Sequence, residues 1–300
     1  QDGFLRANSF QRRSARLKMD HKATKWLKLS FNVNYNNSMN KAPASGSNPG
    51  GAFGSSGLGR LAMAQIPNLP AYNEDGSYNI ENNTIGRKNN LLPAQFSNPA
   101  VLIDLDKNSS ENNRLISNLG AELNLLPGLN FKTSYSWDRR NTEDIRFWNP
   151  YNGDGNSMGG DAYNRYSRAD NWNWINTLSY NKTFNNKHNF GIILGTDAQK
   201  RRTTTWGAER QGLADYFFVD FQGNFGTNLA AGNNITQVAY LAYLGSVSYN
   251  YAGKYFLSAN YRRDGNSALS EDNRWGNFGG VSAGWTISEE DFFKGFHLQD

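Results

Sequence analysis

The sequence predicts an all-β fold, specifically an antiparallel, up-and-down segment of a transmembrane β-barrel. Three observations predict it. Apolar and polar residues alternate over long stretches of the chain. The stretches that alternate are longer than the strands of soluble sheets. Short and long connections between them also alternate along the chain, as in outer-membrane barrels.

The period-two pattern is clearest at 27–36, where every odd position is apolar and every even position is Lys, Ser or Asn. Successive side chains of a strand point to opposite faces, so this strand has one apolar and one polar face. Strands with this pattern are expected, in chain order, at 13–23 (the weakest), 27–36, 114–125, 131–138, 172–180, 190–196, 241–251, 255–261 and 281–287. Their apolar stripes are carried, in the same order, by residues such as Leu17, Phe31, Leu123, Trp137, Trp174, Leu194, Tyr243, Leu257 and Trp285.

The length of the predicted strands indicates that they cross a membrane. Most of the predicted strands have about ten to seventeen residues, whereas strands in soluble sheets have about five or six. A tilted strand needs roughly 9–11 residues to cross the hydrocarbon layer. Nine complete strands is an odd number, and bacterial single-chain barrels have even numbers. We therefore expect 1–300 to be part of one larger barrel domain, with a tenth strand starting at Phe296–Leu298.

The connections sort by length. Short turns are expected at 24–26, 127–129, 185–187, 252–254 and 288–291, and long loops at approximately 37–112, 140–167, 203–236 and 264–273. Successive connections of an antiparallel meander lie at opposite ends, so all short turns share one end and all long loops the other. The alternative is a soluble or surface-attached β-sandwich that binds glycans or mediates adhesion without transport. It would place the apolar stripes in a dry core.

Composition agrees with the barrel and excludes other classes. Aromatic residues reach 14% although the mean hydropathy is −0.72, as expected if half of the strand positions line a wet lumen. No apolar run is long enough for a transmembrane helix. The absence of cysteine excludes a disulfide framework, and a net charge of +5 without a basic block argues against nucleic-acid binding.

The alternation of side chains along each strand predicts which of them face the lumen. These positions are Asn32, Asn34, Arg114, Asn118, Glu122, Asn124, Lys132, Asn171, Asn173 and Arg262. Aromatic residues are expected in two interfacial belts. Trp26, Phe131, Tyr180, Phe184, Tyr251 and Tyr255 lie near the short turns, and Tyr35, Trp137, Trp172, Tyr261 and Trp275 lie near the long loops.

We find no catalytic set, and the sequence predicts neither an enzyme nor a metal or cofactor. The histidines His21, His188 and His297 are isolated in the sequence, and Glu289–Asp291 reads as a solvated turn. Aromatic residues of the long loops are better functional candidates. Rings can stack on apolar faces of a glycan or peptide while nearby amides and guanidinium groups bond its polar groups. The candidates are Trp148, Tyr151, Trp206 and Tyr216, whose rings could equally hold the loops together or contact a partner protein.

Three stretches near the end of the sequence form a recognisable pattern. The chain reads Tyr-Arg-Arg-Asp-Gly-Asn-Ser at 261–267, Asn-Arg-Trp-Gly at 273–276 and Ser-Ala-Gly-Trp-Thr-Ile-Ser-Glu at 282–289. They resemble the pattern of the SusC/RagA family of TonB-linked outer-membrane transporters of Bacteroidota, which is approximately Y-R-x-D-G-S-S, N-R-W-G and S-A-G-W-x-I-S-x-E. The resemblance covers nearly the entire chain, and the 261–290 block is its specific part. Asn266 replaces a Ser of the pattern, and Leu269 stands where an aromatic residue is common.

This resemblance implies a barrel of roughly 22 strands closed by a plug, located in the Gram-negative outer membrane. It also implies a SusD-like surface lipoprotein as partner and import of oligosaccharides or peptides, powered by the TonB complex. The plug and the N-terminal extension that contacts TonB are absent from these 300 residues. The chain would then supply the barrel wall and the ligand-capturing loops.

Overall fold

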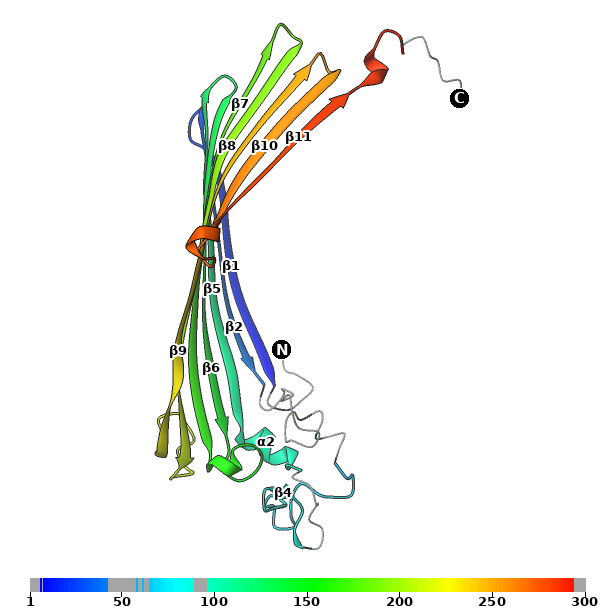
Figure 1. Cartoon of the computed structure of the whole chain (residues 1–300). Coiled ribbons are helices and arrows are strands. Elements are labelled where there is room, and N and C mark those ends of the chain that lie inside the picture. Colours follow the sequence, from blue (N-terminus) through cyan, green and yellow to red (C-terminus); the bar gives the residue numbers. More distant parts are fainter. Residues whose placement is uncertain are drawn as a thin grey trace.

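The computed structural model describes residues 8–42, 65–88 and 96–293, together with residues 6, 58 and 61. Within them, nine long strands form one antiparallel sheet in which every strand pairs with its neighbours in the chain. Figure 1 shows this sheet as a single curved and twisted layer. The strands are β1 (Ser9–Lys22), β2 (Leu27–Lys41), β5 (Lys107–Leu126), β6 (Leu129–Trp148), β7 (Asp161–Phe184), β8 (His188–Leu213), β9 (Phe225–Tyr251), β10 (Tyr255–Asn266) and β11 (Trp275–Trp285).

Tight turns connect the strands at the upper end in Figure 1. Asn185 and Asn186 both have positive φ, and the amide of Lys187 donates to the carbonyl of Phe184 over 3.1 Å. Two consecutive positive φ values give the type I′ turn, whose twist matches that of the flanking strands. Ala252 and Gly253 form the equivalent turn between β9 and β10. These turns confirm the predicted hairpins.

The segment after β11 differs from the solvated turn expected there. The Glu290 carboxylate accepts hydrogen bonds from the Tyr255 hydroxyl (2.6 Å), the Lys254 ammonium (3.0 Å) and the Trp285 indole (3.1 Å). These donors stabilise the ionised form and lower the pKa of Glu290 to about 2. Glu290 therefore ties the chain after β11 back to the β9–β10 turn. The tenth strand expected at Phe296–Leu298 lies outside the described residues.

Small elements gather at the opposite end, at the bottom of Figure 1. They are the two-residue strands β3 (Ile80–Glu81) and β4 (Thr84–Ile85), helix α2 (Pro99–Leu105) and the 3₁₀ turn η2 (Asn156–Met158). Asn98 caps α2, since its side chain accepts a hydrogen bond from the amide of Ala100 over 3.0 Å. No helix among the described residues is long and apolar enough to cross a membrane.

The sheet has no covering layer in the part of the chain that the structure describes. The clusters of buried apolar residues, around Phe147 and around Leu102, both lie at the long-loop end. Phe31 and Leu123 are only partly buried, and Trp285 is 51% exposed. A β-sandwich needs a second sheet packed on the side of the first sheet that carries the apolar stripes. The sandwich alternative is therefore wrong for the fold.

The strands reach further into the long loops than the alternation predicts. The predicted loops are 37–112, 140–167, 203–236 and 264–273. In the structure β2 continues to Lys41 and β5 begins at Lys107, and the other three connections are 149–160, 214–224 and 267–274, because strand pairing continues beyond the apolar band. The two longest strands, β8 and β9, have 26 and 27 residues. The predicted loop boundaries are thus wrong, whereas the sorting of short turns and long loops to opposite ends is confirmed.

Candidate ligand-binding site

The register of the sheet places all apolar stripes on one face. Directly paired residues share a face, and Phe31 pairs with both Met19 and Leu119, which in turn pairs with Tyr135. The same chain of pairs continues through Trp174 and the following strands to β11. We call this surface the apolar face and the opposite one the polar face.

Rings line both margins of the apolar face. Near the short turns, Tyr255 lies between Tyr251 and Trp285, with ring centroids 6.2 and 6.4 Å apart. Near the long loops, Tyr243 stacks on Trp275 at 6.2 Å. Ring-to-ring contacts across neighbouring strands stabilise the sheet. The two margins have the positions of the interfacial belts of a membrane barrel.

The polar face carries a continuous set of hydrogen-bonding side chains. Arg114 forms a bidentate pair with Asp138, at 2.9 and 2.7 Å, and Asn173 donates to Asp197 over 3.0 Å. All ten residues expected to face a lumen lie on this face by register, namely Asn32, Asn34, Arg114, Asn118, Glu122, Asn124, Lys132, Asn171, Asn173 and Arg262. Their contact with a conduit stays a prediction.

Buried asparagines join two of the long loops into one body. The fully buried Asn152 accepts a hydrogen bond from the amide of Asn98 over 2.6 Å and donates to Asn83 over 3.3 Å. Asn98 in turn donates to the carbonyl of Ala71 over 2.7 Å. Because buried polar groups are costly unless bonded, these contacts fix the segments 71–83 and 98–106 relative to the loop 149–160. Sequence reasoning missed this network.

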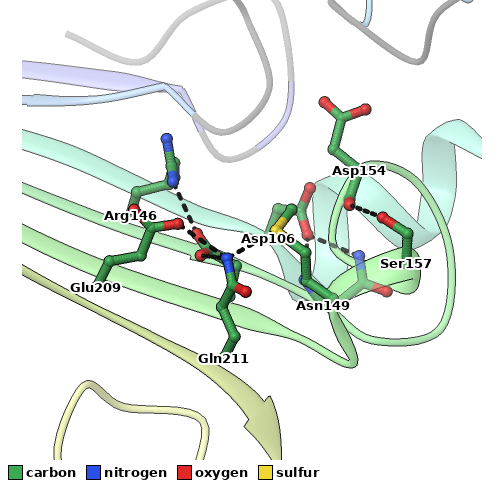
Figure 2. A network of polar contacts seen from close by, with 9 residues as sticks. Asp106, Arg146, Asn149, Asp154, Ser157, Glu209 and Gln211 are labelled. Atoms are coloured by element: carbon green, nitrogen blue, oxygen red, sulfur yellow. Dashed lines mark hydrogen bonds and ion pairs between the residues drawn. The ribbon is translucent and has the colours of Figure 1, made fainter. Parts of the chain in front are cut away.

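Asp106 closes the same body (Figure 2). One carboxylate oxygen accepts hydrogen bonds from the backbone amide and the side-chain amide of Asn149, at 2.9 and 2.6 Å. Asp106 is nevertheless buried, with no basic partner among the described residues. Burial raises its pKa to about 7, and the two bonds from Asn149 only partly oppose that effect.

A charged cluster lies on the polar face where β6, β7 and β8 approach this body (Figure 2). The guanidinium of Arg146 pairs with the buried carboxylate of Asp161 at 2.7 Å, and Gln211 bridges Asp161 and Glu209 at 3.3 and 3.0 Å. Arg146 also lies over the ring of Trp148 at 3.8 Å. Trp148 therefore has a structural partner of its own.

The structure does not bring the four predicted ligand-binding aromatics together. Tyr151 and Tyr216, from neighbouring loops, are exposed and have ring centroids 5.1 Å apart. Trp206 lies on the same side of the sheet as the apolar face, packed against Tyr166 at 5.9 Å. Tyr151 and Tyr216 thus form one exposed aromatic pair, Trp148 lies against Arg146, and Trp206 faces the other way.

A cavity on the polar face was not predicted from the sequence. It has a volume of about 470 Å³ and lies between strands β8–β11 and the loop 267–274. Its lining includes Tyr240, Arg262, Arg274 and Phe278. One signal was available in the sequence. Tyr240 and Phe278 are aromatic at positions where the alternation expects polar residues, and this puts their rings on the polar face.

Comparisons with known proteins agree with this architecture. No family model matches the chain. A TonB-dependent receptor of Formosa agariphila is 29% identical over 97% of this chain and 26% of its own length. The TonB-dependent receptor SusC of Bacteroides thetaiotaomicron is 24% identical over 98% of this chain and 29% of its length. The solved RagAB peptide transporter superposes with a TM-score of 0.73 at 19% identity, over 95% of this chain and 31% of that one.

The resemblance to the SusC/RagA type is confirmed. The chain spans between a quarter and a third of the length of the curated relatives that it matches. The SusC-like chain is a segment of an outer-membrane β-barrel wall. In such a wall the outward face of each strand contacts lipid and the inward face is polar. The apolar face with its two aromatic margins has the properties of the lipid-facing surface.

Proposed function

We propose that the SusC-like chain is the wall and the ligand-capturing loop region of a TonB-dependent importer of oligosaccharides or peptides. The observation that carries the proposal is the polar face. It extends over the nine long strands behind an apolar band and leads away from the loop body. In this proposal the chain confines and recognises the ligand and makes or breaks no bond.

The loop end offers the first contact surface. Tyr151 and Tyr216 present exposed rings beside each other, and Phe217 and Phe218, which follow Tyr216, are 84% and 58% exposed. Exposed apolar patches mark interaction sites, because leaving them in water is unfavourable. We assign the Tyr151–Tyr216 pair to ligand capture and Phe217 and Phe218 to contact with a SusD-like surface lipoprotein. In this proposal the TonB complex supplies the energy for import.

Ligand uptake by cells carrying the full-length receptor and its lipoprotein tests this assignment. The double variant Tyr151→Ala/Tyr216→Ala should lower uptake at limiting ligand concentration at least about fivefold, since stacking on two rings is worth about 1 kcal/mol or more. Trp206→Ala is the matched control, because it also removes a loop-end ring but on the apolar side, and should leave uptake unchanged. Equal uptake by the double variant and the unmodified receptor would remove the ring pair from the ligand route.

A further inference from the structure

Four basic residues lie close together on three neighbouring strands, on the same side of the sheet as the apolar face. They are Arg139 on β6, Arg168 on β7, and Lys200 and Arg202 on β8. We call these four residues the basic patch. Neighbouring strands lie about 5 Å apart, so the patch spans only about 10 Å across the sheet.

The basic patch begins where the aromatic margin of the long-loop end stops. Trp137 and Trp172 are direct partners in that margin, and Lys200 pairs with Trp172 in the same row. Arg139 lies one row further, and its guanidinium lies over the Trp137 ring at 4.9 Å. One row is two residues, or about 7 Å along the strand. Because aromatic margins lie at the level of the lipid headgroups, the patch lies at that level or directly above it.

Asp170 lies at the centre of the basic patch and holds two of its members. One carboxylate oxygen accepts a hydrogen bond from Nε of Arg139, and the other accepts one from Nε of Arg168, each at 2.7 Å. The terminal nitrogens of both guanidinium groups have no acceptor among the residues that the structure describes. Asp170 therefore orients two guanidinium groups side by side and leaves their terminal donors available to another anion.

The other two members of the patch carry unpaired charges. Lys200 and Arg202 form no ion pair and no side-chain hydrogen bond with any residue that the structure describes. The four cations surround one carboxylate, so three positive charges are left uncompensated. The next carboxylates on this side of β5 and β6, those of Glu111 and Glu143, lie two rows further from the apolar band than Asp170. The patch is therefore strongly attractive to an anion.

The concentration of charge is local to β6, β7 and β8. In the cross-strand row that contains Arg139 and Arg202, the neighbouring positions are Tyr35 on β2, Leu115 on β5 and Gln237 on β9. None of these three residues is charged. Uncharged side chains thus suffice at this level of the wall on the strands to either side, and the basic patch indicates a specific partner.

We propose that the basic patch binds the phosphate headgroup of an anionic lipid in the outer leaflet of the membrane. Long loops mark the outer side of such barrels, so the patch faces that leaflet. The terminal nitrogens of Arg139 and Arg168 donate to the phosphate oxygens, because guanidinium groups bind phosphate strongly. Lys200 and Arg202 add positive charge around the phosphate, and the apolar face contacts the acyl chains.

A lipid fits this surface better than an acidic segment of a partner protein does. The patch continues directly into the apolar face through the row of Trp137 and Trp172. A molecule with an anionic head and apolar chains matches both surfaces, whereas an acidic segment matches only the charges. The lipid site uses the position of the wall in the membrane and does not depend on which ligand the receptor imports.

Native mass spectrometry of the full-length receptor, released from a non-ionic detergent, tests the proposal by counting bound lipids. The probes are phosphatidic acid, phosphatidylcholine with the same acyl chains, and inorganic phosphate. The unmodified receptor should bind the first phosphatidic acid about tenfold or more tightly than phosphatidylcholine, since each cation near an anionic headgroup adds about fivefold. Inorganic phosphate in excess should displace little of the lipid. Its complete displacement would indicate a site for free phosphate and would overturn the proposal.

Substitutions within and outside the patch locate the site. Lys200→Gln/Arg202→Gln should remove most of the preference for phosphatidic acid. Arg13→Gln/Lys182→Gln is the matched control, because it removes the same charge from the same side of the sheet but outside the patch, and it should keep the preference. Heat-modifiable gel mobility identifies the variants that retain the folded barrel. Equal preferences in the two double variants, or no preference in the unmodified receptor, would overturn the proposal.

Asp170→Asn distinguishes an oriented site from general electrostatic attraction. This variant makes the patch more positive but removes the carboxylate that holds Arg139 and Arg168. The preference for phosphatidic acid should fall by at least about threefold, because the donors are no longer held in place. An unchanged or stronger preference would mean that charge alone attracts the lipid, and it would overturn the assigned geometry.

Discussion

At the scale of single residues, Asp106 has an unusual environment for a titratable group. Its carboxyl group is buried and accepts two hydrogen bonds from Asn149, yet burial holds its pKa at about 7. The neutral form of Asp106 is therefore favoured below about pH 7 in the folded loop body. Asn149 is 43 residues away in the sequence, and no local sequence pattern indicates that the two side chains meet. Sequence reasoning could not have found it.

Because Asp106 is buried, we expect the stability of the loop body to fall as the pH rises. Because the folded pKa (about 7) exceeds the ordinary value of 3.8, the carboxyl contributes stability that is complete below about pH 4 and is lost as the pH rises through 7. Hydrogen exchange of the Asn149 amide in the full-length protein, corrected for intrinsic rates, should be less protected at pH 8.5 than at pH 5.5. Asp106→Asn should remove this difference, and a difference that persists in the variant would exclude Asp106 as its source.

At the scale of elements, the alternation of side chains explains each strand of the sheet. Phe31 lies on the apolar face midway along the band of β2, and Asn34 lies on the polar face of the same strand. Phe31→Arg should destabilise the full-length barrel in lipid by about 2–4 kcal/mol, the cost of a cation near the bilayer midplane. Urea unfolding in vesicles measures it. Asn34→Arg is the control and should change stability little, so similar losses in both variants would contradict the assignment of the faces.

The hairpin between β5 and β6 depends on a glycine. Gly128 has a φ of +85°, and a Cβ there would collide with the carbonyl oxygen of Asn181. Gly253 has a φ of +72° with open space around it. Gly253→Ala should therefore cost about 1 kcal/mol of unfolding free energy, from backbone strain alone, and Gly128→Ala clearly more. Matched urea unfolding curves compare them, and an equal cost would mean that the β7 backbone yields without penalty.

The sequence predicted the strands well where one face meets lipid and poorly beyond it. In the middle of the sheet hydrocarbon demands an apolar residue at every second position, so the alternation is strong. Beyond the aromatic margin both faces of a strand are wet, and segments such as 142–144 and 203–205 are polar throughout. They resemble loops in sequence but pair as strands. For the same reason the alternation assigned the ten predicted residues to the polar face correctly. The contacts between loops, and the side of the sheet on which Trp206 lies, could be seen only in the structure.

At the scale of the whole molecule, the sheet is a single layer whose stability depends on closure and on lipid. A barrel has no free edge, so its backbone hydrogen bonds are all satisfied and it resists detergent. The full-length protein extracted from outer membranes should migrate faster on a gel before boiling than after it. Recovery in the aqueous fraction without detergent, with a single mobility, would contradict the membrane assignment.

The unusual length of the central strands has a consequence for access. Strands of 26 and 27 residues rise about 3.4 Å per residue and tilt by about 40°, so they stand roughly 70 Å tall against an apolar band of about 25 Å. Most of that height projects above the bilayer as a collar. In the proposed importer, a ligand that moves toward the cell would meet the inner surface of this wall well before it reaches the level of the lipid.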